Sequence, residues 1–144
     1  MNFCVSLTLD ENLMVQDAAG PPELAVTQQS DMALRRAMVA ARVAEENRGR
    51  DIVILDLREL TAIFDYFVLA TGTSRRQLHA MSEEIDRVLQ EELNDRRMGI
   101  EGYDASRWIL LDYGDVVIHL FEPEMRAYYA LEDLWAHAKR IAWK

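Results

Sequence analysis

The chain has 144 residues, of which 50% are apolar and 28% are charged, and this length and composition are typical of a single globular domain. Acidic residues outnumber basic ones by 25 to 16, and the net charge of −9 disfavours bare nucleic acid or an anionic membrane as a partner. The single cysteine, Cys4, excludes an intrachain disulfide and a cysteine-based zinc site.

The first 29 residues differ in pattern from the rest of the chain. Gly20, Pro21 and Pro22 interrupt any regular element, so we predict a poorly ordered or loosely docked tail over residues 1–29 and a single domain over residues 30–144. The apolar start lacks a basic segment, and no apolar run approaches the roughly 20 residues that span a bilayer. The sequence therefore predicts a cytoplasmic protein without membrane contact.

A helix and two strands are expected next. Ser30 can cap a helix over residues 31–47, where apolar residues recur at helical spacing, and Gly49 is expected to end it. Two short apolar runs rich in β-branched residues, 51–57 and 66–71, predict strands that are buried on both faces.

The clearest helix of the sequence follows these strands. Ser74 and Gln77 have the spacing of a capping box, and the apolar residues behind them recur at helical intervals, which predicts a helix over residues 74–93. A short strand is expected near residues 98–101.

The last third of the chain predicts a hairpin and a helix. Residues 108–111 and 116–121 are apolar runs joined by a tight turn, in which Gly114 is expected to take a positive φ. Pro123 suits the first turn of a helix, which we predict over residues 124–141. This order of elements predicts an α/β fold, a mixed β-sheet flanked by helices.

One histidine, His119, interrupts an apolar strand and is the strongest candidate for a polar role in the core. We favour a structural histidine that is hydrogen-bonded to a carboxylate over a catalytic base. Asp112 or Asp115 could supply that carboxylate.

The turn from Gly72 to Ser74, with Arg75 behind it, resembles a helix start that binds phosphate. It matches neither a P-loop nor a dinucleotide fingerprint. The simpler interpretation is that Gly72 makes the turn and Ser74 caps the helix. A nucleotide- or phosphate-binding enzyme that uses this turn stays open as the alternative.

Acidic and aromatic residues gather between residues 101 and 135, where eight acidic residues lie against two arginines. The aromatic members include Trp108, Tyr128, Tyr129 and Trp135. Aromatic anchors inside a charged rim are typical of protein interfaces, and the acidic charge favours a basic protein as the partner. The other interpretation is that the tryptophans belong to the core and the acids form a solvated face.

These segments resemble the ribosomal silencing factor family, also called the Iojap family, from about residue 31 to residue 135. The resemblance is carried by several blocks: Asp65–Ser74 with Arg76 and Gln77, Glu101-Gly102, Trp108–Asp112, Gly114–His119, Arg126, Tyr128, Tyr129, Leu131, Glu132, Leu134 and Trp135. Because independent blocks agree in order and spacing, the resemblance is specific.

The resemblance implies a translational repressor that binds the large ribosomal subunit through the basic ribosomal protein L-fourteen. There it would block joining with the small subunit when nutrients run short. It also implies a fold similar to nucleotidyltransferases without their catalytic carboxylates, and hence no enzyme and no cofactor.

We hypothesise that the partner-binding residues are Trp108, Asp112, Asp115, Tyr128, Tyr129 and Glu132, with Trp108 as the anchor. Steric exclusion needs no catalysis, and the negative charge implies little direct contact with nucleic acid. A homodimer that buries the same aromatic surface is a further possibility.

Overall fold

The computed structural model describes residues 22–144 of the chain. The chain divides into two compact units, Met1–Met32 and Ala33–Lys144. In the first unit the described residues form the beginning of a helix, and the second unit holds the sheet. Residues 1–21, most of the predicted tail, lie outside the described residues.

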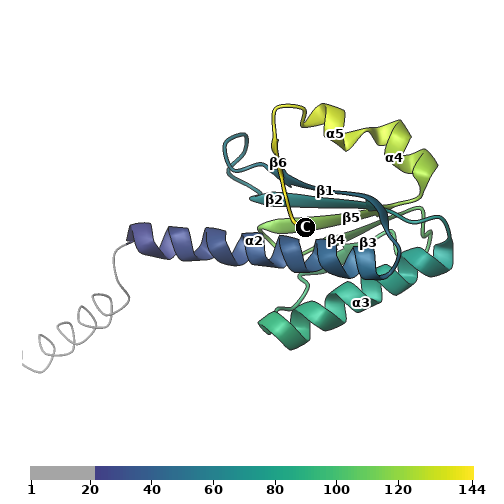
Figure 1. The fold of residues 1–144 in the computed structure, drawn as a ribbon, viewed down its shortest axis with the longest axis horizontal. Helices are drawn as coiled ribbons and strands as arrows, with labels where there is room; N and C mark the ends of the chain where they lie inside the picture. The colour runs from purple at the N-terminus through teal and green to yellow at the C-terminus, as the bar shows by residue number, and fades with distance from the viewer. Residues whose placement is uncertain (1–21) are drawn as a thin grey trace, which may run out of the picture. The chain divides into compact units, whose positions relative to one another are not determined.

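Within residues 22–144, six strands form one mixed sheet in the order β3-β4-β5-β2-β1-β6 (Figure 1). Strands β2 and β5 are parallel, and all other neighbours are antiparallel. The elements in chain order are α2 (Pro22–Glu46), β1 (Arg50–Asp56), β2 (Tyr66–Thr71), α3 (Arg75–Leu93), β3 (Gly99–Glu101), β4 (Trp108–Asp112), β5 (Val116–Phe121), α4 (Pro123–Tyr129), α5 (Leu131–Leu134) and β6 (Lys139–Ile141).

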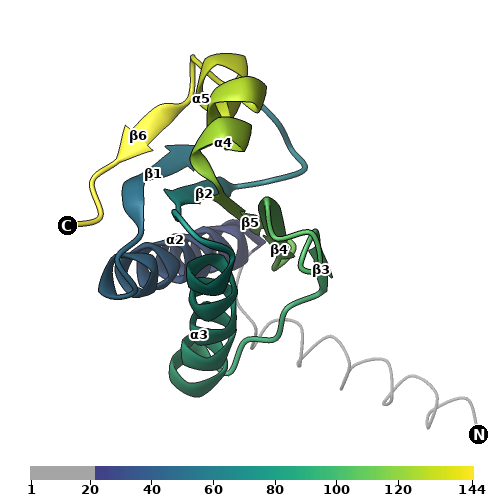
Figure 2. The ribbon, with the colours of Figure 1, turned by 90° about the vertical axis from the view of Figure 1, so that its right-hand side faces the viewer.

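Each face of the sheet is covered by its own helices (Figure 2). Helix α3 and the part of α2 from Ala33 onward pack on one face, where Val68 and Ile118 contribute to the larger core. Helices α4 and α5 lie against the other face, where Phe67 and Phe121 belong to a second, smaller core. The α/β class with a mixed sheet flanked by helices is confirmed.

The two central strands explain why the sequence there is continuously apolar. Every residue of β2 and β5 is buried, because helices cover both faces of these strands. Strand β1 is buried only in its second half, so the prediction for residues 51–57 was too strong.

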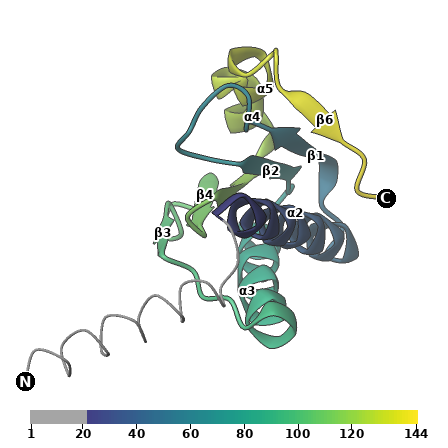
Figure 3. The same cartoon turned by 90° about the vertical axis from the view of Figure 1, so that its left-hand side faces the viewer.

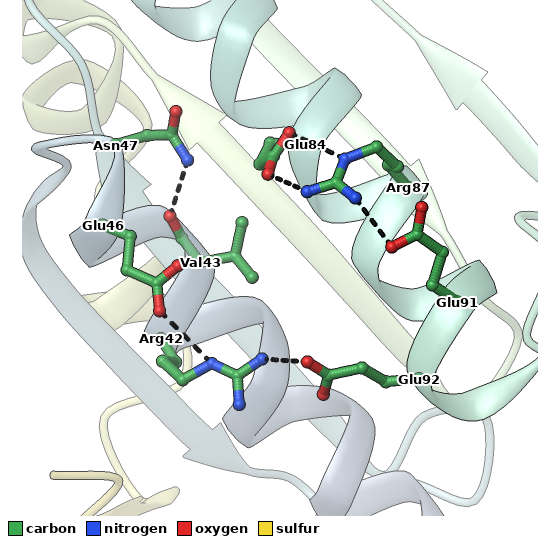
Figure 4. Close-up of polar contacts among 8 residues, drawn as sticks. All are labelled: Arg42, Val43, Glu46, Asn47, Glu84, Arg87, Glu91 and Glu92. Atoms are coloured by element: carbon green, nitrogen blue, oxygen red, sulfur yellow. Dashed lines mark hydrogen bonds and ion pairs between the residues drawn. The ribbon is translucent and has the colours of Figure 1, made fainter.

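Helix α3 begins as its sequence predicts. The Ser74 hydroxyl caps it by accepting a hydrogen bond from the Gln77 backbone N–H at 3.1 Å. On the exposed side, Arg42 of α2 donates to Glu92 of α3 at 2.8 Å, while Arg87 pairs with Glu84 and Glu91 within α3 (Figure 4). These exposed pairs contribute little stability individually, so the apolar stripe of α3 supplies most of its attachment.

Helix α2 starts earlier than predicted, at Pro22, and Ser30 is an interior residue rather than a cap. A proline is well suited to the first helical turn because its missing N–H is not needed there. At the other end, Arg48 rather than Gly49 has the positive φ, of 64°.

The predicted helix over residues 124–141 is wrong in its second half. Ala130 takes a left-handed conformation with φ 45° and ends α4, and only the four residues of α5 follow. The chain then extends into β6, which pairs with β1 at the sheet edge (Figure 3). Helical spacing over residues 131–141 cannot reveal this pairing, because the open edge of β1 is formed far away in the sequence.

Among the helices of residues 22–144, none combines the length and apolarity that crossing a bilayer requires.

Candidate functional site

Trp108 opens strand β4 and lies at the rim of the smaller core, where it is half-buried. Alternation along β4 buries Ile109 and Leu111 on the opposite face, so Trp108 points to the face that carries α4 and α5. Its ring lies 4.9 Å from that of Phe121 and 4.8 Å from that of Tyr129, measured between centroids.

Two tyrosines at the end of α4 extend this aromatic surface into solvent. Tyr128 is 79% exposed and Tyr129 is 46% exposed, and their rings meet edge-to-face with centroids 5.0 Å apart. Trp108, Tyr128 and Tyr129 therefore form one contiguous group, which we call the aromatic cluster. Large exposed aromatic side chains with fixed neighbours are the residue types that anchor protein interfaces.

A hollow of about 380 Å³ lies beside the cluster, lined by Arg107, Glu124, Met125, Tyr128 and Tyr129. Arg107 pairs with Glu122 at 2.6 Å and with Glu124 at 3.6 Å. The hydrogen bond to Glu122 raises the pKa of Arg107. Glu124 lines this hollow and Glu122 is bound to its Arg107, and the site hypothesis omitted both carboxylates. Pro123 was the clue, because it begins α4 and places Glu124 in its first turn.

Glu132 does not join the aromatic cluster. Its carboxylate accepts from Arg126 at 2.8 Å and lies 3.5 Å from Arg140. Arg126 also donates to the Thr71 hydroxyl at 2.8 Å, which ties α4 to the end of β2. Glu132 is therefore engaged in an internal ion-pair network.

Asp112 and Asp115 lie at the opposite end of the β4–β5 hairpin from Trp108. Asp112 accepts from the Gly114 backbone N–H at 2.7 Å, and Asp115 pairs with Arg36 of α2 at 3.2 Å. Burial raises the pKa of Asp115, against the opposing effect of Arg36. At about 3.4 Å per residue, β4 separates Trp108 from Asp112 by roughly 14 Å. The structure thus brings together three of the six hypothesised residues and separates the three acids from them.

His119 lies in the middle of β5 and is 4% exposed. Its Nδ1 accepts a hydrogen bond from the indole Nε1–H of Trp108 at 3.1 Å, so its partner is this indole and neither Asp112 nor Asp115. Burial lowers the pKa of His119 to about 3. A buried position fits the structural role that the sequence suggested, but the expected carboxylate partner was wrong.

The turn from Gly72 to Ser74 uses its polar groups internally. Gln77 accepts from the Thr73 backbone N–H at 2.7 Å, and Arg75 donates to the Asp104 carbonyl at 2.5 Å and to Ser106 Oγ at 3.2 Å. The side chain of Arg75 is therefore bound to the β3–β4 connection. This geometry supports the capping interpretation over a phosphate cradle. Among residues 22–144, no group of three or more histidine, cysteine or carboxylate side chains is placed to hold a metal.

Comparison with known proteins gives a consistent set of relatives. A family model described as "Ribosomal silencing factor during starvation" matches residues 30–144. The ribosomal silencing factor RsfS of Bacillus subtilis is 39% identical over 101 residues, which cover 69% of this chain and 84% of the relative. The mouse protein named "Mitochondrial assembly of ribosomal large subunit protein 1" is 39% identical over 100 residues, 68% of this chain and 43% of the relative.

A solved structure agrees with these sequence matches. The crystal structure of a Chromobacterium violaceum protein superposes with a TM-score of 0.69 at 36% identity, and the match covers 72% of this chain and 85% of that one.

Proposed function

Because the chain belongs to the ribosomal silencing factor family, we propose that it represses translation by binding the large ribosomal subunit and sterically blocking its joining with the small subunit. A ribosome-associated silencing role follows from the family itself. The name of the mouse relative, which refers to assembly of the ribosomal large subunit, supports the choice of subunit. Because the family description names starvation, we also propose that the repression acts when nutrients run short.

The observation that carries the proposal is the aromatic cluster. Its three rings form a row. Trp108 lies on the sheet and is half-buried, while Tyr129 and Tyr128 follow it on α4 and are exposed. Such a row buries a large apolar area with little loss of side-chain entropy, which is the usual chemistry of a binding hot spot. We propose that it contacts the basic ribosomal protein L-fourteen.

The charge around the cluster supports a basic protein rather than RNA as the contact. Glu124 lines the hollow beside the cluster, Glu122 pairs with the Arg107 that also lines it, and the whole chain carries a net charge of −9. Acidic side chains at a rim accelerate encounter with a basic surface, and they repel the phosphates of ribosomal RNA. We therefore propose little direct contact with nucleic acid. Asp112 and Asp115 contribute to this field from the far end of the hairpin.

A steric mechanism fits a domain of this size without any catalytic step. A small protein on a surface that two subunits must share excludes the second subunit by occupying that space. The proposal requires neither enzymatic activity nor a cofactor.

The test is a sucrose-gradient assay with purified large and small subunits. The protein should travel with large subunits and reduce the peak of joined ribosomes. Trp108→Ala should weaken binding by about 2–4 kcal/mol, as expected for a central anchor, and Tyr128→Ala by about 1–2 kcal/mol. Met98→Ala is the matched control, because Met98 is 74% exposed and lies by Gly114 at the other end of the hairpin.

Two outcomes contradict the proposal. Migration with small subunits, or no migration with either subunit, removes the ribosomal role assigned here. Unchanged binding by folded Trp108→Ala and Tyr128→Ala proteins removes the aromatic cluster as the contact. Sedimentation over a range of protein concentrations tests whether the protein forms a homodimer. A dimer that buries the aromatic cluster would compete with binding to the large subunit.

A further inference from the structure

The polar end of Trp108 faces into the protein. Its Nε1–H donates to the buried His119 Nδ1 at 3.1 Å, so this hydrogen bond is made inside the protein and not with solvent. The hydrogen bond selects one orientation of a ring that packing holds only in part. What Trp108 presents outward is therefore the carbon surface of the indole.

The acceptor of this hydrogen bond is itself rigidly held. His119 lies on β5 in the interior of the sheet, opposite Leu110 of β4 on one side and Leu69 of β2 on the other. Its ring lies 4.6 Å from the ring of Phe67 and is stacked on that of Phe121 at 5.9 Å. Because the His119 ring is confined in this way, its Nδ1 has a fixed position, and the hydrogen bond fixes the orientation of the indole that donates to it.

The hydrogen bond also defines the tautomer of the neutral His119 ring. Because Nδ1 accepts, the ring proton resides on Nε2, which finds no hydrogen-bond partner among the described residues. Leaving a buried polar group unpaired is costly, so a core position of this kind would favour an apolar residue unless the histidine served another purpose. The bond to Trp108 is the only polar interaction described for this ring.

We propose that His119 is the positioning residue of the aromatic cluster, which holds the Trp108 indole against Tyr129 so that its apolar surface faces the partner. Its effect on affinity rests on the proposed ribosomal function, but its effect on Trp108 does not. The partner group that meets Trp108 is accordingly apolar or cationic, and it needs no hydrogen-bond acceptor for the indole.

The first test observes the indole N–H of Trp108 in the free, full-length protein by NMR, with the resonance assigned by its loss in Trp108→Phe. His119→Leu removes the acceptor, whereas His119→Asn places an amide oxygen where Nδ1 stood. We expect faster solvent exchange and a shifted resonance in His119→Leu, and a protected resonance in His119→Asn. An unchanged resonance in His119→Leu overturns the proposal.

The second test measures affinity for purified large subunits. His119→Leu should weaken binding on the order of tenfold, and His119→Asn by less than about threefold. In the Trp108→Phe background, His119→Leu should add almost nothing, because no indole N–H remains to be positioned. An equal loss in both backgrounds means that His119 acts through general stability, and it overturns the proposal.

Two arrangements keep the outcomes separate. If His119→Leu fails to fold, His119→Gln takes its place, since its longer side chain carries the amide away from the Nδ1 position. If the wild-type protein binds no subunit, the proposed function fails, and the indole resonance alone decides whether His119 positions Trp108.

Discussion

Burial of His119 links the stability of the folded protein to pH. In the unfolded chain a histidine has a pKa of about 6.5, whereas burial lowers the pKa of His119 in the fold to about 3. At pH values between these two pKa values, His119 is protonated in the unfolded state but neutral in the native state. The stabilisation is therefore complete above about pH 6.5, and it is lost as the pH falls toward 3.

Urea unfolding at pH 7 and pH 5 measures this effect. The wild-type protein should lose up to about 2 kcal/mol of unfolding free energy over this interval through His119 alone. His119→Asn should lose correspondingly less, because every other titratable group is the same in both proteins. A hydrogen bond from Arg58 lowers the pKa of Asp56 and burial raises the pKa of Asp115, and both groups are the same in the two proteins. Equal losses in the two proteins would contradict the assignment.

The partner of His119 shows how far residue-scale inference from the sequence extends. An isolated histidine in an apolar strand was enough to predict a buried, hydrogen-bonded side chain. Its acceptor geometry depends on strand register, which places Leu110 opposite His119 and Trp108 diagonally from it. The sequence predicted the hairpin but not the direction of each side chain, so nearby carboxylates were favoured over an indole.

At the scale of elements, Gly102 determines how the chain enters β4. Its φ is +78°, and a Cβ atom at this position would lie 2.0 Å from the backbone oxygen of Trp108. Gly102→Ala should therefore destabilise the protein by about 2–4 kcal/mol, measured by urea unfolding. Any folded fraction should show a displaced Trp108 and weaker subunit binding.

Gly99→Ala is the matched control for this prediction. Gly99 lies three residues earlier, in β3, and a Cβ atom there would meet nothing within 4 Å. Its substitution should change the unfolding free energy by less than about 0.5 kcal/mol. Similar costs for the two alanine variants would contradict the steric argument.

The elements that the sequence predicted well are those whose cause is local. The cap at Ser74, the positive φ of Gly114 and the proline start of α4 each depend on a few neighbouring residues. The start of α2 was missed although Pro22 is a local signal, but the failure at the C-terminus depends on a distant part of the chain. The residues that form β6 were assigned to a helix because the edge of β1 that they complete is not visible in their own pattern.

At the scale of the whole molecule, net charge should control how fast the protein reaches its partner. Neutralising Glu122 and Glu124 to Gln should reduce the association rate roughly threefold at low salt, with a smaller effect on dissociation, since rim charges act mainly through steering. Stopped-flow measurements at several salt concentrations test this expectation.

Glu91 and Glu92 supply the comparison for this pair. They lie on α3, on the other side of the sheet, and their change to Gln alters the net charge by the same amount. This variant should slow association less than the α4 variant does. Equal effects would show that total charge, rather than its placement beside the aromatic cluster, governs the encounter.

Helix α4 buries none of its residues, yet it carries two of the three rings of the aromatic cluster. Folding therefore uses mainly Met125 and Arg126 of this helix, and substitutions at its exposed positions leave the two cores intact. If the aromatic cluster is the contact surface proposed above, this separation would let it vary together with its partner over evolutionary time, while the sheet beneath keeps its fold. For protein engineering, the exposed positions of α4 are therefore suited to the redesign of binding specificity at little cost in stability.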